Sequence, residues 1–272
     1  MIDSNTIAIY GSYPNYPHGI IDPIADMAKL ALKYKIGFHV DACLGGLVAA
    51  FLKEHEGKLS ADIEGVTSIS LDHHKYGLAP KGVSTVFTKT RELRYHMYFV
   101  YPDWIGGLYG TPSFVGSRPG FASAGAWYAL THIGKKQYTE NALEISGATK
   151  TVAEGLRKLG GIEVFGNPII CVIAFNTTEV DIYEVCNYLK KNHGWHMSAL
   201  HLPKSVHICI TPANASNIKK HFVNNVKEAI AELKKNPPKQ CDTAAIYGAT
   251  AQLPSSELGE EMMRTAMKVT FS

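Results

Sequence analysis

Short apolar segments alternate with amphipathic segments along the N-terminal part of this 272-residue chain. Residues Thr6 to Tyr10 predict a buried strand, and Ile36 to Val40 predict a second strand. Between them, Asp22 and Pro23 suit the N-cap and first turn of a helix that we expect to end before Gly37. Further elements are expected at Leu47 to Leu52 (helix) and at Val66 to Ser70 and Val83 to Thr88 (strands). This alternation indicates an α/β fold with a mostly parallel sheet.

The sequence changes character after a broken segment from Gly106 to Gly120, where glycine and proline predict a functional loop without regular structure. A helical pattern then runs from Ala122 to Leu159, with a break near Gly134. Later elements are expected at Ile169 to Phe175, His196 to Leu200 and Val206 to Thr211 (strands) and at Ile182 to Lys191 and Ala215 to Lys234 (helices). We therefore expect a first domain at 1–125, a small α+β domain at 126–235 and a tail at 236–272 that ends in a short helix.

Composition excludes several classes of protein. A hydrophobic share of 46% can form a sizeable core, so the chain is not disordered. The net charge of +3 is scattered, whereas nucleic-acid binders usually carry a dense basic stripe, so no nucleic-acid partner is expected. Five cysteines without a CxxC pair predict neither a disulfide framework nor a zinc site. No apolar stretch approaches the ~20 residues that cross a bilayer, and no signal peptide is visible, so we expect a soluble, cytoplasmic chain without a transmembrane segment.

Two charged residues follow two of the expected strands. Asp41 ends the strand IGFHV, and Lys75 follows the strand VTSIS within LDHHKYG. The carboxyl ends of parallel strands meet at one edge of a sheet, where ligands bind. A lysine and an aspartate there suit pyridoxal phosphate, because the amine forms a Schiff base with the aldehyde while the carboxylate keeps the pyridine nitrogen protonated. The alternative is that Asp41 caps a turn and Lys75 is a solvated loop residue.

The neighbouring residues favour the cofactor site. The small residues of HVDACLGG follow Asp41 and let a flat ring approach the backbone, and His74 supplies a donor for a phosphate. Other sites are not indicated, because the sequence has no HExxH, GxSxG, GxGxxG or P-loop motif. The adjacent His73 and His74 would point to opposite sides of an extended backbone, which argues against zinc.

These motifs resemble the pyridoxal phosphate-dependent decarboxylase family, which contains glutamate and aromatic amino-acid decarboxylases and carbon–carbon lyases of phosphorylated sphingoid bases. The matching segments are PHGIIDPIADMAKLALKYKIGFHVDACLGG (17–46), VTSISLDHHKYGLAPKG (66–82), DWIGGLYGTPSFVGSRPG (103–120) and AIYGATAQ (245–252). HVDACLGG and HKYGxAPKG are similar to the lyases, whereas the decarboxylases more often resemble HVDAAWGG. The resemblance implies a fold-type I enzyme and a homodimer with sites at the subunit interface.

The resemblance also implies an activity. The lyases cleave a phosphorylated long-chain base, sphingosine 1-phosphate, to a fatty aldehyde and phosphoethanolamine with pyridoxal 5'-phosphate as cofactor. Two alternatives stay open, namely amino-acid decarboxylation on the same scaffold and a truncated subunit without activity of its own.

Site residues follow from the same resemblance, position by position. Lys75 matches the Schiff-base lysine, Asp41 the partner of the pyridine nitrogen, and Cys43 a small residue near the ring, although Cys43 could equally be a core residue. His74 matches a residue that holds the cofactor phosphate.

Four further residues match positions near the substrate. Lys81 could pair with the substrate phosphate or transfer a proton, and Tyr16 and His18 lie in a loop that faces the substrate. Arg118 could anchor an anion from a loop that reaches across the dimer. The alternatives are an exposed loop lysine for Lys81, loop packing for Tyr16 and His18, and a bond to backbone carbonyls for Arg118.

A complete family member carries more of the large domain before the region that matches Thr6. It includes a loop that cups the cofactor phosphate and a ring that stacks on pyridoxal. We therefore expect residues 1–125 to be the remaining part of a truncated large cofactor-binding domain, with low stability and weak cofactor binding. The resemblance also implies location at the cytosolic face of the endoplasmic reticulum membrane, through an anchor upstream of the matching region.

Overall fold

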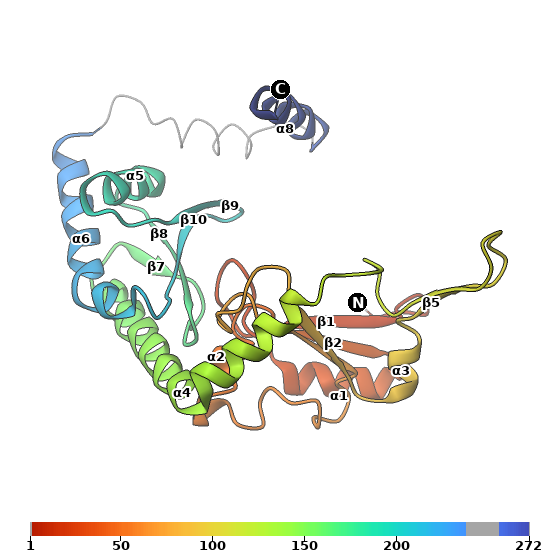
Figure 1. Ribbon diagram of the computed structural model, residues 1–272. Helices are drawn as coiled ribbons and strands as arrows, with labels where there is room; N and C mark the ends of the chain where they lie inside the picture. The colour runs from red at the N-terminus through yellow and green to blue at the C-terminus, as the bar shows by residue number, and fades with distance from the viewer. Residues whose placement is uncertain (1, 238–255, 272) are drawn as a thin grey trace. The chain divides into compact units, whose positions relative to one another are not determined.

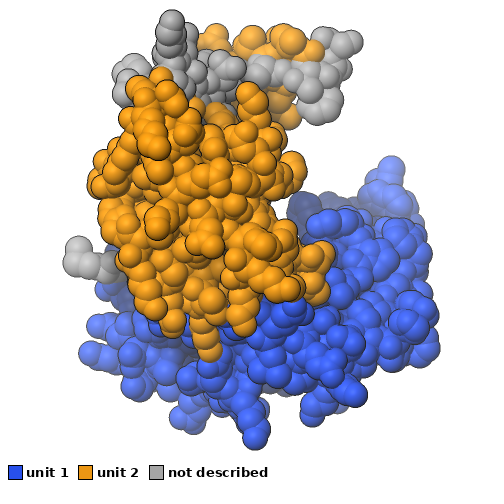
Figure 2. Space-filling view, turned by 90° about the vertical axis from the view of Figure 1, so that its left-hand side faces the viewer, with its two compact units in different colours: residues 1–147, 167–171 blue, residues 148–166, 172–272 orange. Residues whose placement is uncertain are grey.

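The computed structural model of the protein describes residues 2–237 and 256–271, so the motif at 245–252 and Cys241 lie outside the described residues. The chain divides into two compact units, shown in different colours in Figure 2. The first unit comprises residues 1–147 and 167–171, and the second comprises residues 148–166 and 172–272. The domain boundaries expected at residues 125 and 235 stay predictions.

A four-stranded sheet forms the centre of the first unit, in the order β1-β2-β3-β4. Figure 1 shows β1 and β2 side by side in this sheet. β1 (Ala8–Ser12), β2 (Gly37–Asp41) and β3 (Ser68–Asp72) are parallel, and β4 (Ser84–Thr88) runs antiparallel to β3. The mostly parallel sheet predicted from the alternation of elements is therefore confirmed. The carboxyl ends of three strands share one edge, as the pairing of Asp41 with both Ser12 and Ser70 shows.

One face of this sheet is apolar and packs against α1 (Ile24–Tyr34). Phe38 and Val40 of β2 are fully buried, and α1 buries Ile24, Ala28 and Ala31, which recur at helical spacing. Pro23, expected in the first turn, is the N-cap residue instead. The expected stop before Gly37 is confirmed, because Lys35 adopts a left-handed conformation with φ 54° directly after the helix.

The opposite face of the sheet is polar. Because side chains alternate along a strand, Tyr10, His39, Asp41, Ser68 and Ser70 lie on the same face. β1 is an edge strand whose side chains are mostly exposed or half-buried, so the prediction of a buried strand there was wrong. The remaining short elements before residue 96 are α2 (Gly46–Ala49), the 3₁₀ helix η1 (Lys53–His55) and α3 (Arg91–Tyr95).

The segment from Gly106 to Gly120 contains regular structure, contrary to the prediction. β6 (Tyr109–Thr111) pairs antiparallel with β5 (Phe99–Tyr101) in a two-stranded sheet. The long helix α4 (Phe121–Arg157) follows, and it breaks at Gly134, where φ 70° and ψ 165° are not helical. The break expected near Gly134 is therefore confirmed.

The second unit contains a four-stranded antiparallel sheet in the order β7-β8-β10-β9. Its strands are β7 (Ile162–Val164), β8 (Val172–Thr177), β9 (Ser198–His201) and β10 (Lys204–Cys209). Its helices are α5 (Ile182–His193), α6 (Ala215–Lys235) and α8 (Ser256–Phe271). The α+β character and the C-terminal helix agree with the expectation, although β7 was not foreseen. No helix among residues 2–237 and 256–271 is both long and apolar enough to cross a membrane.

Candidate active site

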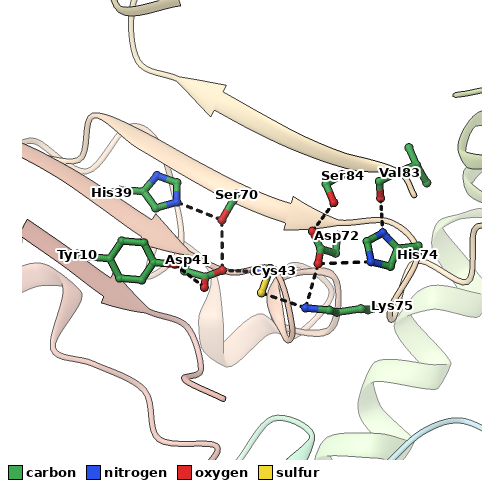
Figure 3. Close-up of polar contacts among 10 residues, drawn as sticks. All are labelled: Tyr10, His39, Asp41, Cys43, Ser70, Asp72, His74, Lys75, Val83 and Ser84. Carbon is green, nitrogen blue, oxygen red and sulfur yellow. Dashed lines mark hydrogen bonds and ion pairs between the residues drawn. The ribbon is translucent and has the colours of Figure 1, made fainter. Parts of the chain in front are cut away.

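Asp41 stands at the carboxyl end of β2 and accepts hydrogen bonds from three residues (Figure 3). The Tyr10 hydroxyl donates to its Oδ2 at 2.6 Å. The backbone N–H of Cys43 and the Ser70 hydroxyl donate to its Oδ1, at 2.9 Å and 3.2 Å. The donors come from β1, from the residues that directly follow β2, and from β3. Hydrogen bonds therefore connect the carboxylate to the two strands that neighbour β2.

The hydrogen bonds to Asp41 lower the pKa of its carboxyl group. Burial works to raise the pKa of this carboxyl group, but the hydrogen bonds from Cys43, Tyr10 and Ser70 outweigh burial and hold the pKa below its usual value. Asp41 is therefore negatively charged at neutral pH. Such a carboxylate can hold the proton of a ring nitrogen.

Lys75 lies in the turn after β3 and contacts two side chains. Its Nζ donates to Cys43 Sγ at 3.1 Å and pairs with Asp72 Oδ2 at 2.9 Å, while the Ser84 hydroxyl donates to Asp72 Oδ1 at 2.5 Å. Burial works to lower the pKa of the Lys75 amine, but the bonds to Asp72 and Cys43 outweigh burial and raise it. Lys75 is therefore an ammonium group, one-third exposed and held in place.

Cys43 separates the two charged groups. Figure 3 shows its side chain between Asp41 and Lys75, in agreement with the hydrogen bonds to both residues. Burial, together with the carboxylate of Asp41, raises the pKa of the Cys43 thiol and outweighs the opposing effect of Lys75. Cys43 is therefore a small, neutral spacer between an anion and a cation.

The turn that carries Lys75 depends on its local sequence. A Cβ on Gly77 would lie 2.5 Å from the His73 carbonyl oxygen, so only glycine fits there. Leu78 adopts φ 56°, a left-handed conformation that costs a non-glycine residue about 1–2 kcal/mol. The backbone N–H groups of Leu78 and Ala79 donate to the carbonyls of Lys75 and His73 and close the turn.

His74 points toward β4 and the carboxylate of Asp72. Its Nδ1 lies 2.8 Å from the Val83 carbonyl oxygen, so this nitrogen carries a proton, because a carbonyl can only accept. Its Nε2 lies 3.7 Å from Asp72 Oδ2. The expected contact of His74 with a cofactor phosphate stays a prediction.

The other expected site residues lie in loops. Tyr16 is exposed and His18 is half-buried in the segment between β1 and α1. Lys81 is exposed in the segment between β3 and β4, and Arg118 is exposed between β6 and α4. Within residues 2–237 and 256–271, no hydrogen bond or ion pair joins Lys81 or Arg118 to the cluster around Lys75. The structure therefore brings together Asp41, Cys43, Lys75 and His74.

Three residues of the cluster were not foreseen. Asp72 pairs with Lys75, and Tyr10 and Ser70 donate to Asp41. Asp72 could have been recognised from the sequence, because it ends β3 and lies three residues before Lys75. Tyr10 and Ser70 were predicted only as the last residues of two strands, and their role depends on the parallel register of β1, β2 and β3.

We expect Asp72→Asn to lower the pKa of Lys75, because the substitution removes the charge that stabilises the ammonium group. Competitive labelling of Lys75 with an amine-specific reagent, read by mass spectrometry across a pH series, measures this pKa. Asp26→Asn is the matched control, because Asp26 pairs with the exposed Lys29 at 2.8 Å. An unchanged Lys75 titration in Asp72→Asn would contradict the assignment.

Comparisons with known proteins show the fold and the family of this chain. The fold is similar to that of a glutamate decarboxylase from Lactobacillus brevis, with a TM-score of 0.73 at 21% identity over 87% of this chain and 57% of that chain. Together with the family match and the solved lyase reported below, this similarity shows that the protein has the fold-type I architecture of pyridoxal phosphate enzymes. Residues 13–178 match the model of the pyridoxal-dependent decarboxylase conserved domain. The chain belongs to this family.

Within the family, the chain is similar to sphingosine-1-phosphate lyases. The Arabidopsis thaliana lyase is 43% identical over 270 residues, which make up 98% of this chain and 49% of that protein. The solved structure of the Burkholderia pseudomallei lyase is 34% identical with a TM-score of 0.79, and the match covers 86% of this chain and 54% of that chain. The chain spans about half the length of the curated relatives it matches.

Proposed function

We propose that this chain binds pyridoxal phosphate at the Asp41–Cys43–Lys75 cluster and acts as part of a carbon–carbon lyase. Its substrate would be a phosphorylated sphingoid base, sphingosine 1-phosphate. The observation that carries the proposal is the series of contacts from Asp41 through Cys43 to Lys75. It occurs in a protein that is 43% identical to a sphingosine-1-phosphate lyase.

The side chains present fit the cofactor. Lys75 offers a primary amine for the aldehyde, and Asp41 offers an ionised carboxylate for the ring nitrogen. Between them, Cys43 is small and uncharged, and the buried Ala42 is small as well. His74, beside Lys75, is the residue that we assign to the phosphate. The chemical character of the cluster therefore matches a flat, cationic ring that carries an aldehyde and an anionic group.

Each residue has a defined task in the proposed reaction. When bound, pyridoxal phosphate supplies an aldehyde that amines attack and a protonated ring that accepts an electron pair. Asp41 holds the proton at the ring nitrogen, because its own pKa is low. Asp72 holds Lys75 as an ammonium group, so the amine becomes a nucleophile only after it has passed this proton on.

The overall reaction breaks the bond between the second and third carbons of the base. The hydroxyl on the third carbon loses its proton as the fatty aldehyde forms, and the second carbon gains a proton as phosphoethanolamine forms. We assign the proton acceptor to Lys75, Lys81 or Tyr16, and substrate binding to Lys81, His18 and Arg118. Lys75 contacts Cys43 and Asp72 directly within the cluster.

Product analysis tests the proposed function. The purified protein, supplied with pyridoxal phosphate and sphingosine 1-phosphate, should release a long-chain aldehyde and phosphoethanolamine in equal amounts. Carbon dioxide released from an amino acid without aldehyde would indicate a decarboxylase instead. Neither product, together with co-purification with an intact lyase subunit, would indicate a subunit without activity.

We further propose that the protein is a homodimer and that the segment containing β5 and β6 lies at its interface. Ile105 and Phe114 of this segment are fully exposed, and Leu108 is 87% exposed. Exposed apolar residues gathered in one segment are typical of an interaction surface. The proposed cellular location is the cytosolic face of the endoplasmic reticulum membrane, which fractionation of cells that express the tagged protein would test.

Leu108→Asp should weaken self-association at least about tenfold, since it places a charge where the dimer buries a leucine. Sedimentation velocity over a concentration series measures the effect. Leu202→Asp is the matched control, because Leu202 is 74% exposed and lies outside this segment. A wild-type monomer, or a dimer equally stable in both variants, would count against the proposed interface.

A further inference from the structure

Tyr10 and Asp41 lie on neighbouring parallel strands and face the same side of the sheet. Tyr10 pairs in register with His39, two residues before Asp41, and the rings of Tyr10 and His39 are 5.3 Å apart. This ring contact directs the phenol along the sheet toward the end of β2, where its hydroxyl reaches Asp41 Oδ2 at 2.6 Å (Figure 3). The ring of Tyr10 therefore takes its direction from His39, and its hydroxyl reaches the candidate site.

The two oxygens of Asp41 have different surroundings. Oδ1 accepts from Cys43 N and from the Ser70 hydroxyl, and the Ser70 oxygen in turn lies 3.1 Å from His39 Nε2. Since the Ser70 proton is directed to Asp41, His39 Nε2 donates to Ser70. Oδ2 accepts from Tyr10. Each carboxylate oxygen offers about two acceptor positions, so Oδ2 is the oxygen with room for a further donor.

We propose that Tyr10 is a positioning residue for Asp41. The phenol of Tyr10 holds Oδ2 in place, so that this oxygen can accept a hydrogen bond from the protonated ring nitrogen of the cofactor, and it keeps the carboxylate ionised. The part that concerns the ring nitrogen rests on the proposed function. The part that concerns the ionisation of Asp41 holds for the protein without cofactor, so the two can be tested separately.

The charges around Asp41 agree with this role. The titratable groups that face Asp41 are Tyr10 from β1, His39 from β2 and Cys43 from the segment after β2. Lys75 lies on the far side of Cys43. Burial and the bond to Asp41 raise the pKa of Tyr10 far above its usual value, so the phenol stays a neutral donor. Burial lowers the pKa of His39 despite the charge of Asp41, so the imidazole stays neutral near pH 7. Tyr10 thus donates a hydrogen bond to Asp41 and stays uncharged over the pH range in which Asp41 titrates.

The titration of Asp41 tests the inference. Tyr10→Phe removes one hydroxyl and keeps the ring that contacts His39. The full chain, labelled with ¹³C at aspartate carboxyl carbons, gives one pH titration curve per aspartate, and Asp41→Asn identifies the curve of Asp41. We expect Tyr10→Phe to shift the Asp41 midpoint upward, because a donor to the charged form is lost. With pyridoxal phosphate present, the acid limb of cofactor binding, followed by absorbance, should move to higher pH as well.

Two further variants separate positioning from general structure. Tyr34→Phe changes a half-exposed tyrosine at the end of α1 and should leave the Asp41 midpoint unchanged. Ser70→Ala removes a donor to Oδ1 and should also raise the midpoint, which serves as a second test if Tyr10→Phe folds poorly. An Asp41 midpoint equal in wild type and folded Tyr10→Phe would overturn the inference. An upward shift in protein that binds no cofactor would support the role of Tyr10 and contradict the proposed function.

Discussion

Lys75→Arg should lower the cleavage of sphingosine 1-phosphate by about a thousandfold or more. Arginine keeps the positive charge beside Asp72, but its guanidinium is not a primary amine and stays protonated at any working pH. It can neither attack an aldehyde nor accept a proton, and losing either step removes a large part of the rate enhancement. Release of the long-chain aldehyde, followed with a coupled dehydrogenase, measures the effect.

The matched control for this substitution is Lys29→Arg. Lys29 also pairs with an aspartate, at 2.8 Å, but it lies exposed on α1. We expect it to retain full activity. The assignment of Lys75 fails if Lys75→Arg retains more than a tenth of the wild-type rate while folding normally.

Asp41→Asn should also remove most of the cleavage activity, because the pyridine nitrogen of the cofactor would no longer be kept protonated. Asparagine has nearly the same shape as aspartate but no charge, so it cannot hold a proton on that nitrogen. We expect a loss of at least about a hundredfold and weaker cofactor binding, read from absorbance titrations. Asp26→Asn, the same substitution on an exposed residue of α1, should change neither quantity.

We also expect the effect of Asp41→Asn on the free energy of unfolding to depend on pH. The pKa of Asp41 is lower in the folded chain than its ordinary value of 3.8, so the ionised carboxylate adds stability above that value and loses it as the pH falls through the folded pKa. The difference in the free energy of unfolding between wild type and Asp41→Asn should therefore be largest near neutral pH and shrink in acid. Urea unfolding at several pH values measures it. A difference that grows toward acid pH would contradict the lowered pKa.

The positions of Asp41 and Lys75 could be predicted because they depend on a general property of parallel sheets. Both residues follow strands, and adjacent parallel strands bring their carboxyl ends together. Strand periodicity and loop length were enough to place them at one edge. Their chemical character then indicated the cofactor before any family was considered.

Tyr10 and Ser70, which support Asp41, could not be predicted in the same way, because their contacts depend on the register of the strands. Tyr10 reaches Asp41 only because β1 and β2 pair with Ser12 opposite Asp41. Asp72 is different, because it contacts Lys75 from three residues away within the same turn, and this spacing is visible in the sequence. A sequence pattern gives the face of a strand but does not give which residues lie opposite it on the next strand.

The hairpin of β5 and β6 was missed for a different reason. Each strand has three residues, and Gly110 lies in the middle of β6, so neither strand has a recognisable alternation. β7, also three residues long, was missed in the same way. Pairing between such strands forms through backbone hydrogen bonds that are independent of side-chain periodicity. The long helix α4 was visible because its pattern extends over many turns.

The most direct test of the central claim is covalent trapping of the cofactor on the wild-type chain. The protein is mixed with pyridoxal phosphate, reduced with borohydride and digested, and the modified peptide is identified by mass. We expect a single pyridoxyl label on Lys75, absent from Lys75→Arg and weakened in Asp41→Asn. No label, or label spread over exposed lysines such as Lys29, would contradict a cofactor site at the Asp41–Cys43–Lys75 cluster.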